Sequence, residues 1–144
     1  VICGSGTEYG KLRTFVEAEK YSNLLLLSGL PRADYDKLVR SCHVGLLFLD
    51  HRFTIPNFPS RLLSYLQAGL PVIACTDPAT DIGDIAQAGF GWKCPSADPA
   101  AFVRTVERAC SADLAAMGDA GRMYFSAHYT AEQSYEIIMR GLER

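Results

Sequence analysis

The sequence predicts an α/β fold in which a parallel sheet is covered by helices on both faces, a Rossmann-like, doubly wound arrangement. Short apolar runs of strand length alternate with amphipathic stretches of helix length through the first two thirds of the chain. This alternation is the pattern of repeated βαβ units and differs from that of a sandwich or a helix bundle. After Cys94 the pattern changes to helices alone. We therefore expect one domain over residues 1–144, with a group of helices at its carboxyl-terminal end.

The expected strands are apolar runs that are too short for helices. They are Val1–Cys3, Leu24–Leu27, Val44–Leu49, Val72–Cys75 and Phe90–Cys94. Between them, apolar residues recur at helical spacing, and this spacing predicts helices near 8–20, 34–42, 60–68 and 81–88. The apolar stripes of these helices are expected to cover the faces of the sheet.

Each helix after Cys94 has a start signal in the sequence. Asp98 is a predicted N-cap, and Pro99 follows at the first helical position, where proline is well tolerated. Ser111 is expected to cap the next helix, and Thr130 to Gln133 form a capping box for the last one. That last helix carries one apolar face, made of Tyr135, Ile138, Met139 and Leu142.

Composition limits the classes of protein to which this chain can belong. With 144 residues, 49% of them hydrophobic and 21% charged, the chain fits a globular domain with an ordinary core. The longest apolar runs are of strand length, far short of a membrane span. The net charge of −2 gives no overall attraction to nucleic acid, so we expect no nucleic-acid partner and only a local anion site.

The cysteines indicate a reducing compartment. There are five, an odd number, and no two are close in sequence. Free cysteine in a strand behaves as a small apolar residue. We therefore expect a cytoplasmic protein without disulfides. The three histidines are not at metal-ligand spacing from a cysteine pair, so no metal is expected.

The most informative segment runs from Asn57 to Ala74 and is typical of a helix aimed at an anion, followed by a buried strand. Pro59 and Ser60 suit the helix start, and Gly69 suits its end. The free N–H groups at such a start favour a negative charge, and Arg61 provides a second contact for a phosphate. A cation in a first turn is unfavourable to the helix by about a few tenths of a kcal/mol, so helix stability does not explain this arginine.

This segment resembles the donor-binding signature of the GT-B glycosyltransferases, specifically the retaining, family-4-like enzymes. Their pattern runs Glu-Gly-Phe-Pro, then Leu-Glu-Ala or a Pro-Ser-Lys-Leu-x-x-Tyr-Leu variant, then Gly-x-Pro-Val-Ile-Ala. The present chain has Pro-Ser-Arg in place of Pro-Ser-Lys, and continues with Gly-Leu-Pro-Val-Ile-Ala. Pro56 and Ser64 stand where the two glutamates of the better-known form fall.

The resemblance covers nearly the whole chain. Val1 to Gly6 is similar to the family's strand that ends in Gly-x-Gly, and Leu24 to Leu30 is similar to the following strand and loop. Gly89 to Pro95, followed by Asp98-Pro99, resembles the family's last strand and helix start. The resemblance implies the C-terminal, nucleotide-sugar-binding domain. Because the chain opens inside a strand without an initiator methionine, we expect a longer protein with an acceptor domain before Val1.

The resemblance also implies which residues bind the donor. Backbone and side chains of two glycine-containing loops and of the 60–68 helix start are expected around the nucleotide, the diphosphate and the sugar. The residues implied are Gly4, Gly6, Leu30, His51, Ser60, Arg61, Leu62, Leu63 and Ser64. No catalytic residue is assigned, because the groups that act on the acceptor are expected on the preceding domain.

Several polar residues have both a functional and a structural interpretation. Asp77, Asp81 and Asp84 surround a helix start, where acids are expected for electrostatic reasons. His51, after a strand end, is interpreted either as a donor contact or as a solvated loop residue. Trp92, in a strand, is interpreted as a packing residue.

The predicted activity is transfer of a sugar from a nucleotide-diphosphate sugar to a glycan or lipid-linked acceptor, as in polysaccharide biosynthesis. The resemblance implies no cofactor, since these enzymes need no metal, and contact with a membrane only through the preceding domain. Two alternatives remain open, a nucleotide-sugar 2-epimerase of the same fold and a non-catalytic interaction domain. The sequence does not indicate the base, the sugar, the acceptor or the oligomeric state.

Overall fold

The computed structural model describes the chain except for residues 53–54, 56, 78–79, 81 and 143–144. The chain divides into two compact units, Val1–Leu38 and Val39–Arg144, and each is described by itself. The expectation of one domain over residues 1–144 stays a prediction.

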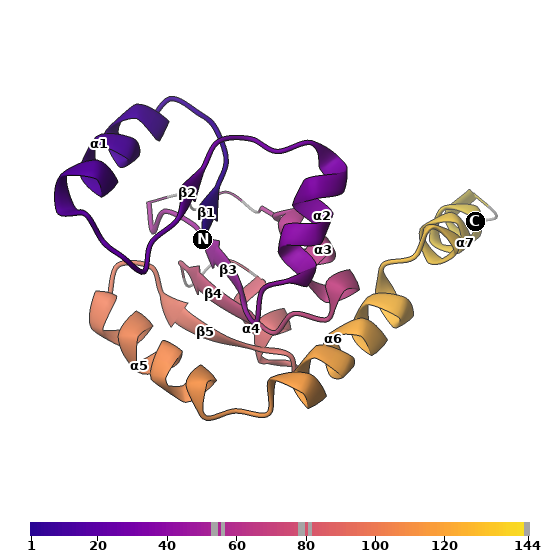
Figure 1. Cartoon of the computed structure of the whole chain (residues 1–144). Helices are drawn as coiled ribbons and strands as arrows, with labels where there is room; N and C mark the ends of the chain where they lie inside the picture. Colours follow the sequence, from indigo (N-terminus) through magenta and orange to yellow (C-terminus); the bar gives the residue numbers. More distant parts are fainter. Residues whose placement is uncertain (53–54, 56, 78–79, 81, 143–144) are drawn as a thin grey trace. The chain divides into compact units, whose positions relative to one another are not determined.

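The first unit contains two short parallel strands joined by a helix. Strand β1 (Ile2–Cys3) pairs with β2 (Leu26–Leu27), and α1 (Tyr9–Glu19) lies between them in sequence (Figure 1). This is the predicted βαβ unit, with strands shorter than the apolar runs because only two residues of each strand pair in register. Helix α2 (Arg32–Arg40) follows, and the division between the two units falls within it.

The second unit is built on a three-stranded parallel sheet in the order β3-β4-β5. Its strands are β3 (Gly45–Phe48), β4 (Val72–Thr76) and β5 (Gly91–Pro95), and the helices that cross between them are α3 (Arg61–Ala68) and α4 (Ile82–Gln87). The central strand β4 is buried along its whole length. Parallel strands that are covered on both faces have this property, which explains the continuous apolar run in the sequence.

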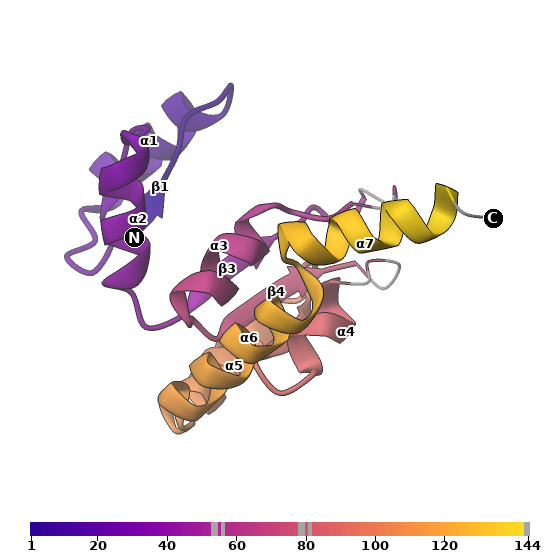
Figure 2. The same ribbon diagram turned by 90° about the vertical axis from the view of Figure 1, so that its right-hand side faces the viewer.

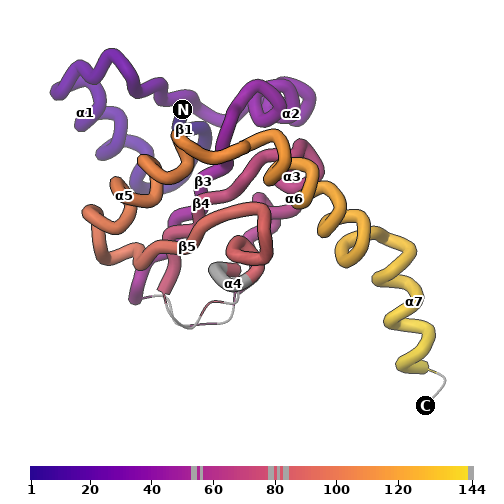
Figure 3. Tube along the Cα trace, turned by 90° about the horizontal axis from the view of Figure 1, so that it is seen from below, coloured from indigo at the N-terminus to yellow at the C-terminus, as the bar shows by residue number. Residues whose placement is uncertain are grey.

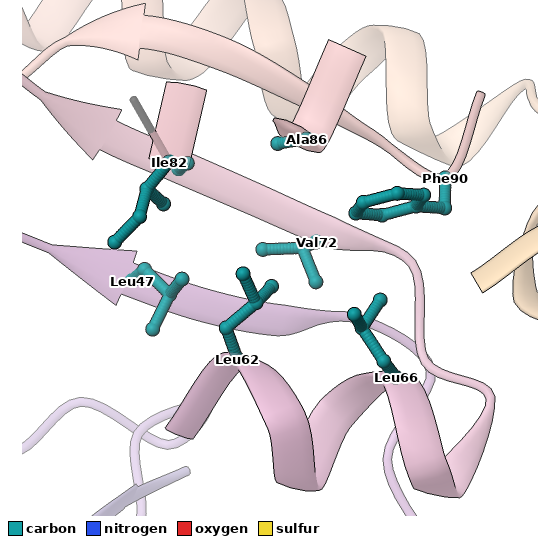
Figure 4. Close-up of a cluster of buried hydrophobic side chains, with 8 residues drawn as sticks. Leu47, Leu62, Leu66, Val72, Ile82, Ala86 and Phe90 are labelled. Carbon is teal, nitrogen blue, oxygen red and sulfur yellow. The ribbon is translucent and has the colours of Figure 1, made fainter. Parts of the chain in front are cut away.

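Alternate residues of β4 pack into two different cores. Val72 and Ala74 face α3 and α4, in a cluster with Leu47, Leu62, Leu66, Ile82, Ala86 and Phe90 (Figure 4). Ile73 and Cys75 face the other way, where Trp92, Cys94 and Ala109 complete the second cluster. Because side chains of a strand alternate between the two faces, one apolar run supplies both cores. The sheet is therefore covered by helices on both faces, as the sequence predicts.

The end of α3 packs on a later helix, α6 (Leu114–His128), with backbone close to backbone. Gly69 ends α3 with a φ of 74°, a conformation that glycine adopts without steric cost. A Cβ atom added to Gly118 of α6 would overlap the carbonyl oxygen of Gly69. The guanidinium of Arg122 donates to the carbonyl oxygen of Ala68 at 3.1 Å. Glycine is thus required at position 69 by its backbone angle and at position 118 by close approach of the two helices.

The cap predicted for the first of the carboxyl-terminal helices is confirmed. Helix α5 covers Pro99–Cys110, and the carboxylate of Asp98 accepts from the N–H of Ala101 at 2.9 Å.

The cap predicted for the second helix is wrong. Ser111 belongs to the end of α5, since its N–H donates to the carbonyl oxygen of Arg108. The cap of α6 is Asp113, whose carboxylate accepts from the N–H of Ala116 at 3.0 Å. Both residue types suit an N-cap, and the turn that ends α5 decides between them.

Of the two hydrogen bonds in the predicted capping box of the last helix, one forms. Helix α7 covers Ala131–Leu142, and the Thr130 hydroxyl accepts from the N–H of Gln133 at 3.3 Å. The side-chain amide of Gln133 donates to the carbonyl oxygens of Ser126 and Ala127 in the last turn of α6. In a full capping box, the side chain of Gln133 would instead accept a hydrogen bond from the N–H of Thr130. The chain bends between α6 and α7 at this point (Figure 2).

The apolar face of α7 is uncovered among the described residues. The helix has no buried residue, and Tyr135, Ile138, Met139 and Leu142 are all exposed. Figure 3 shows α7 running away from the sheet after α6. The helix and its apolar face are as predicted, but the described part of the chain places nothing against that face.

The predicted fold class is confirmed, because the chain is a mixed α/β protein with parallel sheets flanked by helices. The five predicted strands are all present, with ends shifted by one or two residues. Among the described helices, none combines the length and the apolar character that crossing a bilayer requires.

Candidate functional site

The start of α3 lies at the carboxyl edge of the second unit's sheet. Helix α3 follows β3 and runs back across the sheet, so its first turn lies near the ends of the strands. Figure 4 shows this directly, since Leu62 lies nearer the strand arrowheads than Leu66. This edge is where open parallel sheets bind their ligands. The helix start for which the sequence predicts an anion site therefore lies at this edge; the anion site itself stays a prediction.

Only part of the predicted cradle of N–H groups is free. The N–H of Leu62 donates to the carbonyl oxygen of Pro59 at 2.9 Å, and that of Leu63 donates to Ser60 at 3.1 Å. Ser60 has helical backbone angles and its side chain makes no capping hydrogen bond. Within the described chain, no backbone acceptor bonds the N–H of Ser60 or Arg61. Two backbone donors therefore remain for a ligand.

The side chains of this first turn differ in what they can contact. Leu62 is fully buried in the core, which leaves it no surface for a ligand, and Leu63 and Ser64 are half-buried. Arg61 is exposed, and it has no ion-pair partner in the described regions. The first turn of α3 carries no acidic residue. The exposed groups of the turn thus combine two N–H donors and one cation.

The loop after β3 begins with an internally satisfied charge pair. The Arg52 side chain donates to both carboxylate oxygens of Asp50, at 2.9 and 2.6 Å, and the Arg52 N–H donates at 2.9 Å. These hydrogen bonds hold the pKa of Asp50 well below its usual range, so the carboxylate is a weak base. His51 is exposed, with Nδ1 3.7 Å from Asp50. The Asp50 carboxylate is thus paired with Arg52, whereas the His51 ring is exposed to solvent.

The predicted glycine loop lines a cavity of about 690 Å³ in the first unit. Gly4 and Gly6 stand at its wall with Ser5 and Thr7, and the remaining lining residues are Ile2, Glu8, Tyr9, Lys11, Leu12 and Leu26. Lys11, the only cation among the described lining residues, is paired with Glu8 at 2.7 Å. The cavity is therefore largely apolar with a polar loop at one side, which suits a base or a ribose better than a diphosphate.

The predicted donor residues are divided between the two units. Gly4, Gly6 and Leu30 belong to the first unit, and Leu30 is exposed there. The residues from His51 to Ser64 belong to the second. Gly4 and Gly6 line the cavity of the first unit, whereas His51 lies in the loop after β3 and Ser60 to Ser64 at the start of α3.

Sequence reasoning missed a buried polar group at the end of the central strand. Asp77, directly after β4, is 2% exposed, and its carboxylate accepts from the Thr80 hydroxyl at 2.5 Å. The neighbouring hydroxyls of Thr76 and Ser96 are buried and lack hydrogen-bond partners within the described part of the chain. Asp81 and the side chain of Asp84, the other two acids around this helix start, lie outside the described residues. The signal for this polar edge in the sequence is the run of acids that begins at Asp77.

Two cysteines that are distant in sequence meet inside the second core. Cys75 and Cys94 lie opposite each other on β4 and β5, with their Sγ atoms 3.2 Å apart. Burial, and then Cys94 itself, raise the pKa of the Cys75 thiol to about 12. A thiol so rarely ionised is a poor nucleophile and a poor metal ligand at neutral pH. These residues therefore act as packing groups, as sequence reasoning expected of strand cysteines.

No protein-family model matches the chain. The chain is 25% identical over 134 residues to a protein from Pseudomonas aeruginosa named "Probable glycosyltransferase WbjE". The aligned region covers 92% of this chain and 34% of that protein, so the chain spans about a third of the relative's length. The chain is thus distantly related to a glycosyltransferase.

Proposed function

We propose that this chain is the donor-binding domain of a retaining glycosyltransferase that moves a sugar from a nucleotide-diphosphate sugar to a glycan or lipid-linked acceptor. The observation that carries the proposal is the first turn of α3. It presents two N–H groups that have no backbone acceptor among the described residues, together with the exposed cation of Arg61, at the carboxyl edge of a parallel sheet. The distant relationship to a glycosyltransferase supports the same function.

The chemistry of sugar transfer explains why donors are useful there. When the bond between the sugar's anomeric carbon and the diphosphate breaks, the departing diphosphate gains negative charge. Donors already fixed in place stabilise that charge without having to reorganise. The N–H groups of Ser60 and Arg61 and the Arg61 guanidinium are donors of this kind, and no metal is required for this step.

Acceptor chemistry is assigned to another part of the protein. Since the chain spans about a third of its relative's length, a second domain is expected to form the facing wall of the cleft. Orientation of the acceptor and exclusion of water need both walls. We therefore expect this chain alone to bind donor without transferring sugar, and a donor-consumption assay with acceptor extract tests it. Acceptor-dependent turnover by the chain alone would contradict this division of labour.

Titration calorimetry in EDTA tests the donor site itself. UDP, GDP and ADP are titrated separately into the folded 144-residue chain, and at least one should bind weakly. Arg61→Ala should weaken that binding by about 1–3 kcal/mol, the range for losing a charge-assisted hydrogen bond, with an unchanged melting temperature. Arg61→Lys keeps the cation and should lose less.

Arg140→Ala is the matched control for this titration. Arg140 is exposed and pairs with Glu136 on α7, away from the α3 start, so its loss should leave nucleotide affinity unchanged. Absence of heat with all three nucleotides at millimolar concentration would overturn the proposed function. Equal effects of Arg61→Ala and Arg140→Ala would show that only overall charge matters.

A further inference from the structure

A continuous row of aromatic rings runs from the loop before α3 into the core of the second unit. Phe58 contacts Tyr129, with ring centroids 5.4 Å apart. Tyr129 contacts Tyr124 at 6.0 Å, and Tyr124 contacts Phe90 at 5.1 Å. Phe90 is fully buried at the start of β5. The row therefore joins a loop residue to a fully buried residue of the core.

Phe58 is close in sequence to the N–H groups of Ser60 and Arg61, which have no backbone acceptor in the part of the chain that the structure describes. It precedes Ser60 by two residues and Arg61 by three. Since successive Cα atoms are about 3.8 Å apart, a displacement of Phe58 moves the donors of Ser60 and Arg61 with it. Tyr129 is the ring that Phe58 contacts in the described part of the chain. Holding Phe58 is thus one way to hold the donors.

Tyr129 is well placed to act as a fixed support. It caps the end of α6, where its N–H donates to the carbonyl oxygen of Phe125 at 2.8 Å. It packs against the cluster that contains Leu62 and Leu66 of α3. Burial and the neighbouring Tyr124 raise the pKa of its hydroxyl, so it stays protonated across the neutral range. Backbone and side chain are both anchored.

Burial alone does not account for the contact between Phe58 and Tyr129. Phe58 remains 44% exposed, so its ring removes much less area from water than a core phenylalanine does. What the contact does provide is a preferred orientation of the Phe58 ring, because paired aromatic rings prefer particular geometries. The contact ties a segment before α3 to the end of α6, about seventy residues later in the sequence.

We propose that Tyr129 is a positioning residue for the candidate donor site, acting through its ring contact with Phe58 to hold the N–H groups of Ser60 and Arg61 in place. This inference rests on the proposed function for the identity of the ligand. It assigns to the end of α6 a role in donor affinity, although Tyr129 does not itself touch the ligand.

A double-mutant cycle on nucleotide affinity tests the inference. The probe is whichever of UDP, GDP and ADP binds the wild-type chain most tightly. Tyr129→Leu should weaken binding by about 2- to 10-fold, the range expected from the energy of one aromatic pair. In a Phe58→Leu background the same change should have less than about 2-fold effect, because the contact is already lost. Tyr129→Phe keeps the ring and should bind as the wild type does.

Phe48→Leu is the matched control. Phe48 is similarly exposed and contacts Phe102 with centroids 5.2 Å apart, on the sheet face that α5 covers. Its loss should leave nucleotide affinity unchanged. An unchanged affinity in Tyr129→Leu overturns the inference, as do independent effects of the two changes. If Tyr129→Phe weakens nucleotide binding as much as Tyr129→Leu does, the effect is due to the hydroxyl. The ring contact is then not its cause, and the inference is overturned.

Amide NMR spectra separate failure of this inference from failure of the proposed function. In the free, ¹⁵N-labelled chain, Tyr129→Leu should shift the amide signals of Ser60 and Arg61, and Phe48→Leu should not. If no nucleotide binds but these signals shift, the proposed function fails and the positioning contact stands. Suppose instead that the wild type binds nucleotide, that Arg61→Ala weakens this binding, and that Tyr129→Leu changes neither the amide signals nor the affinity. The positioning role of Tyr129 is then wrong, while the proposed function stands.

Discussion

Helices α3 and α7 carry the same kind of apolar stripe, but only α3 is covered. Leu62 and Leu66 of α3 have no exposed surface, whereas Ile138 and Leu142 of α7 are mostly exposed. The two helices differ in the elements to which the chain connects them. Helix α3 lies between β3 and β4 in the chain, so it must lie against the sheet. Helix α7 follows another helix, α6, and runs away from the sheet (Figure 3). Helical spacing therefore predicts an apolar face, while chain topology decides what that face packs against.

The largest expected effect compares one apolar side chain from each helix. Leu66→Ala should lower the free energy of unfolding by about 2–5 kcal/mol, because it leaves a cavity in a closed core. Ile138→Ala should change it by less than about 0.5 kcal/mol, because Ile138 is 61% exposed. Urea unfolding followed by fluorescence of Trp92 measures both. A large loss in Ile138→Ala would show that α7 is covered in solution.

A second comparison uses one glycine from each region. Gly118→Ala should destabilise the protein by about 1–3 kcal/mol, because the added methyl group would overlap the carbonyl oxygen of Gly69 and separate α3 from α6. The methyl group added in Gly141→Ala meets no atom of the described residues within 4 Å, and alanine favours a helix over glycine by about 0.5–1 kcal/mol. Thermal unfolding and far-ultraviolet circular dichroism check the pair. Equal stability of the two variants would contradict the close approach of α3 and α6.

The helix caps provide a third comparison of smaller size. Asp98→Ala removes the cap of α5, which packs on the sheet, and should cost about 1 kcal/mol of global stability. Thr130→Ala removes the cap of α7 and should fray that helix without lowering the global midpoint. Hydrogen exchange distinguishes the two results. If both changes lower the urea midpoint equally, α7 unfolds together with the core.

The last effect is the smallest at neutral pH, where the stability difference is zero, and it develops only in alkali. The folded-state pKa of Cys75 is raised to about 12, against about 8.5 in an unfolded chain. The stabilisation is fully present below about pH 8.5 and is lost as pH rises towards 12, because the unfolded state releases the proton first. The free energy of unfolding should fall more steeply with pH in the wild type than in Cys75→Ala, by at most about 1.4 kcal/mol per pH unit. Cys110→Ala, at an exposed site, should leave the slope unchanged.

Much of the candidate site could be predicted because its signals are local. Pro59, Ser60 and Gly69 mark the ends of α3, and the helix begins and ends where they indicate. The position of Arg61 in the first turn is a direct consequence. What could not be predicted is which N–H groups are already used, since the bonds from Leu62 and Leu63 to Pro59 and Ser60 depend on the backbone angles of that turn.

The caps show the same limit on a smaller scale. Asp98 could be identified from its neighbour Pro99, and the structure confirms it. Ser111 and Asp113 are equally good caps by residue type, so the choice depended on where α5 ends. Local chemistry names the candidates, and the geometry of the preceding turn selects one.

The sequence by itself determined the order of strands and helices, the α/β class and the apolar faces, because each depends on residues a few positions apart. Only the tertiary structure decided that Cys75 meets Cys94, that Asp77 is buried at the sheet edge, that the ring of Tyr129 contacts that of Phe58 and that the face of α7 is left uncovered among the described residues. These are contacts, or missing contacts, between residues far apart in the chain. They depend on which surfaces the packed sheet brings together, and the periodicity of a single segment contains no information about them.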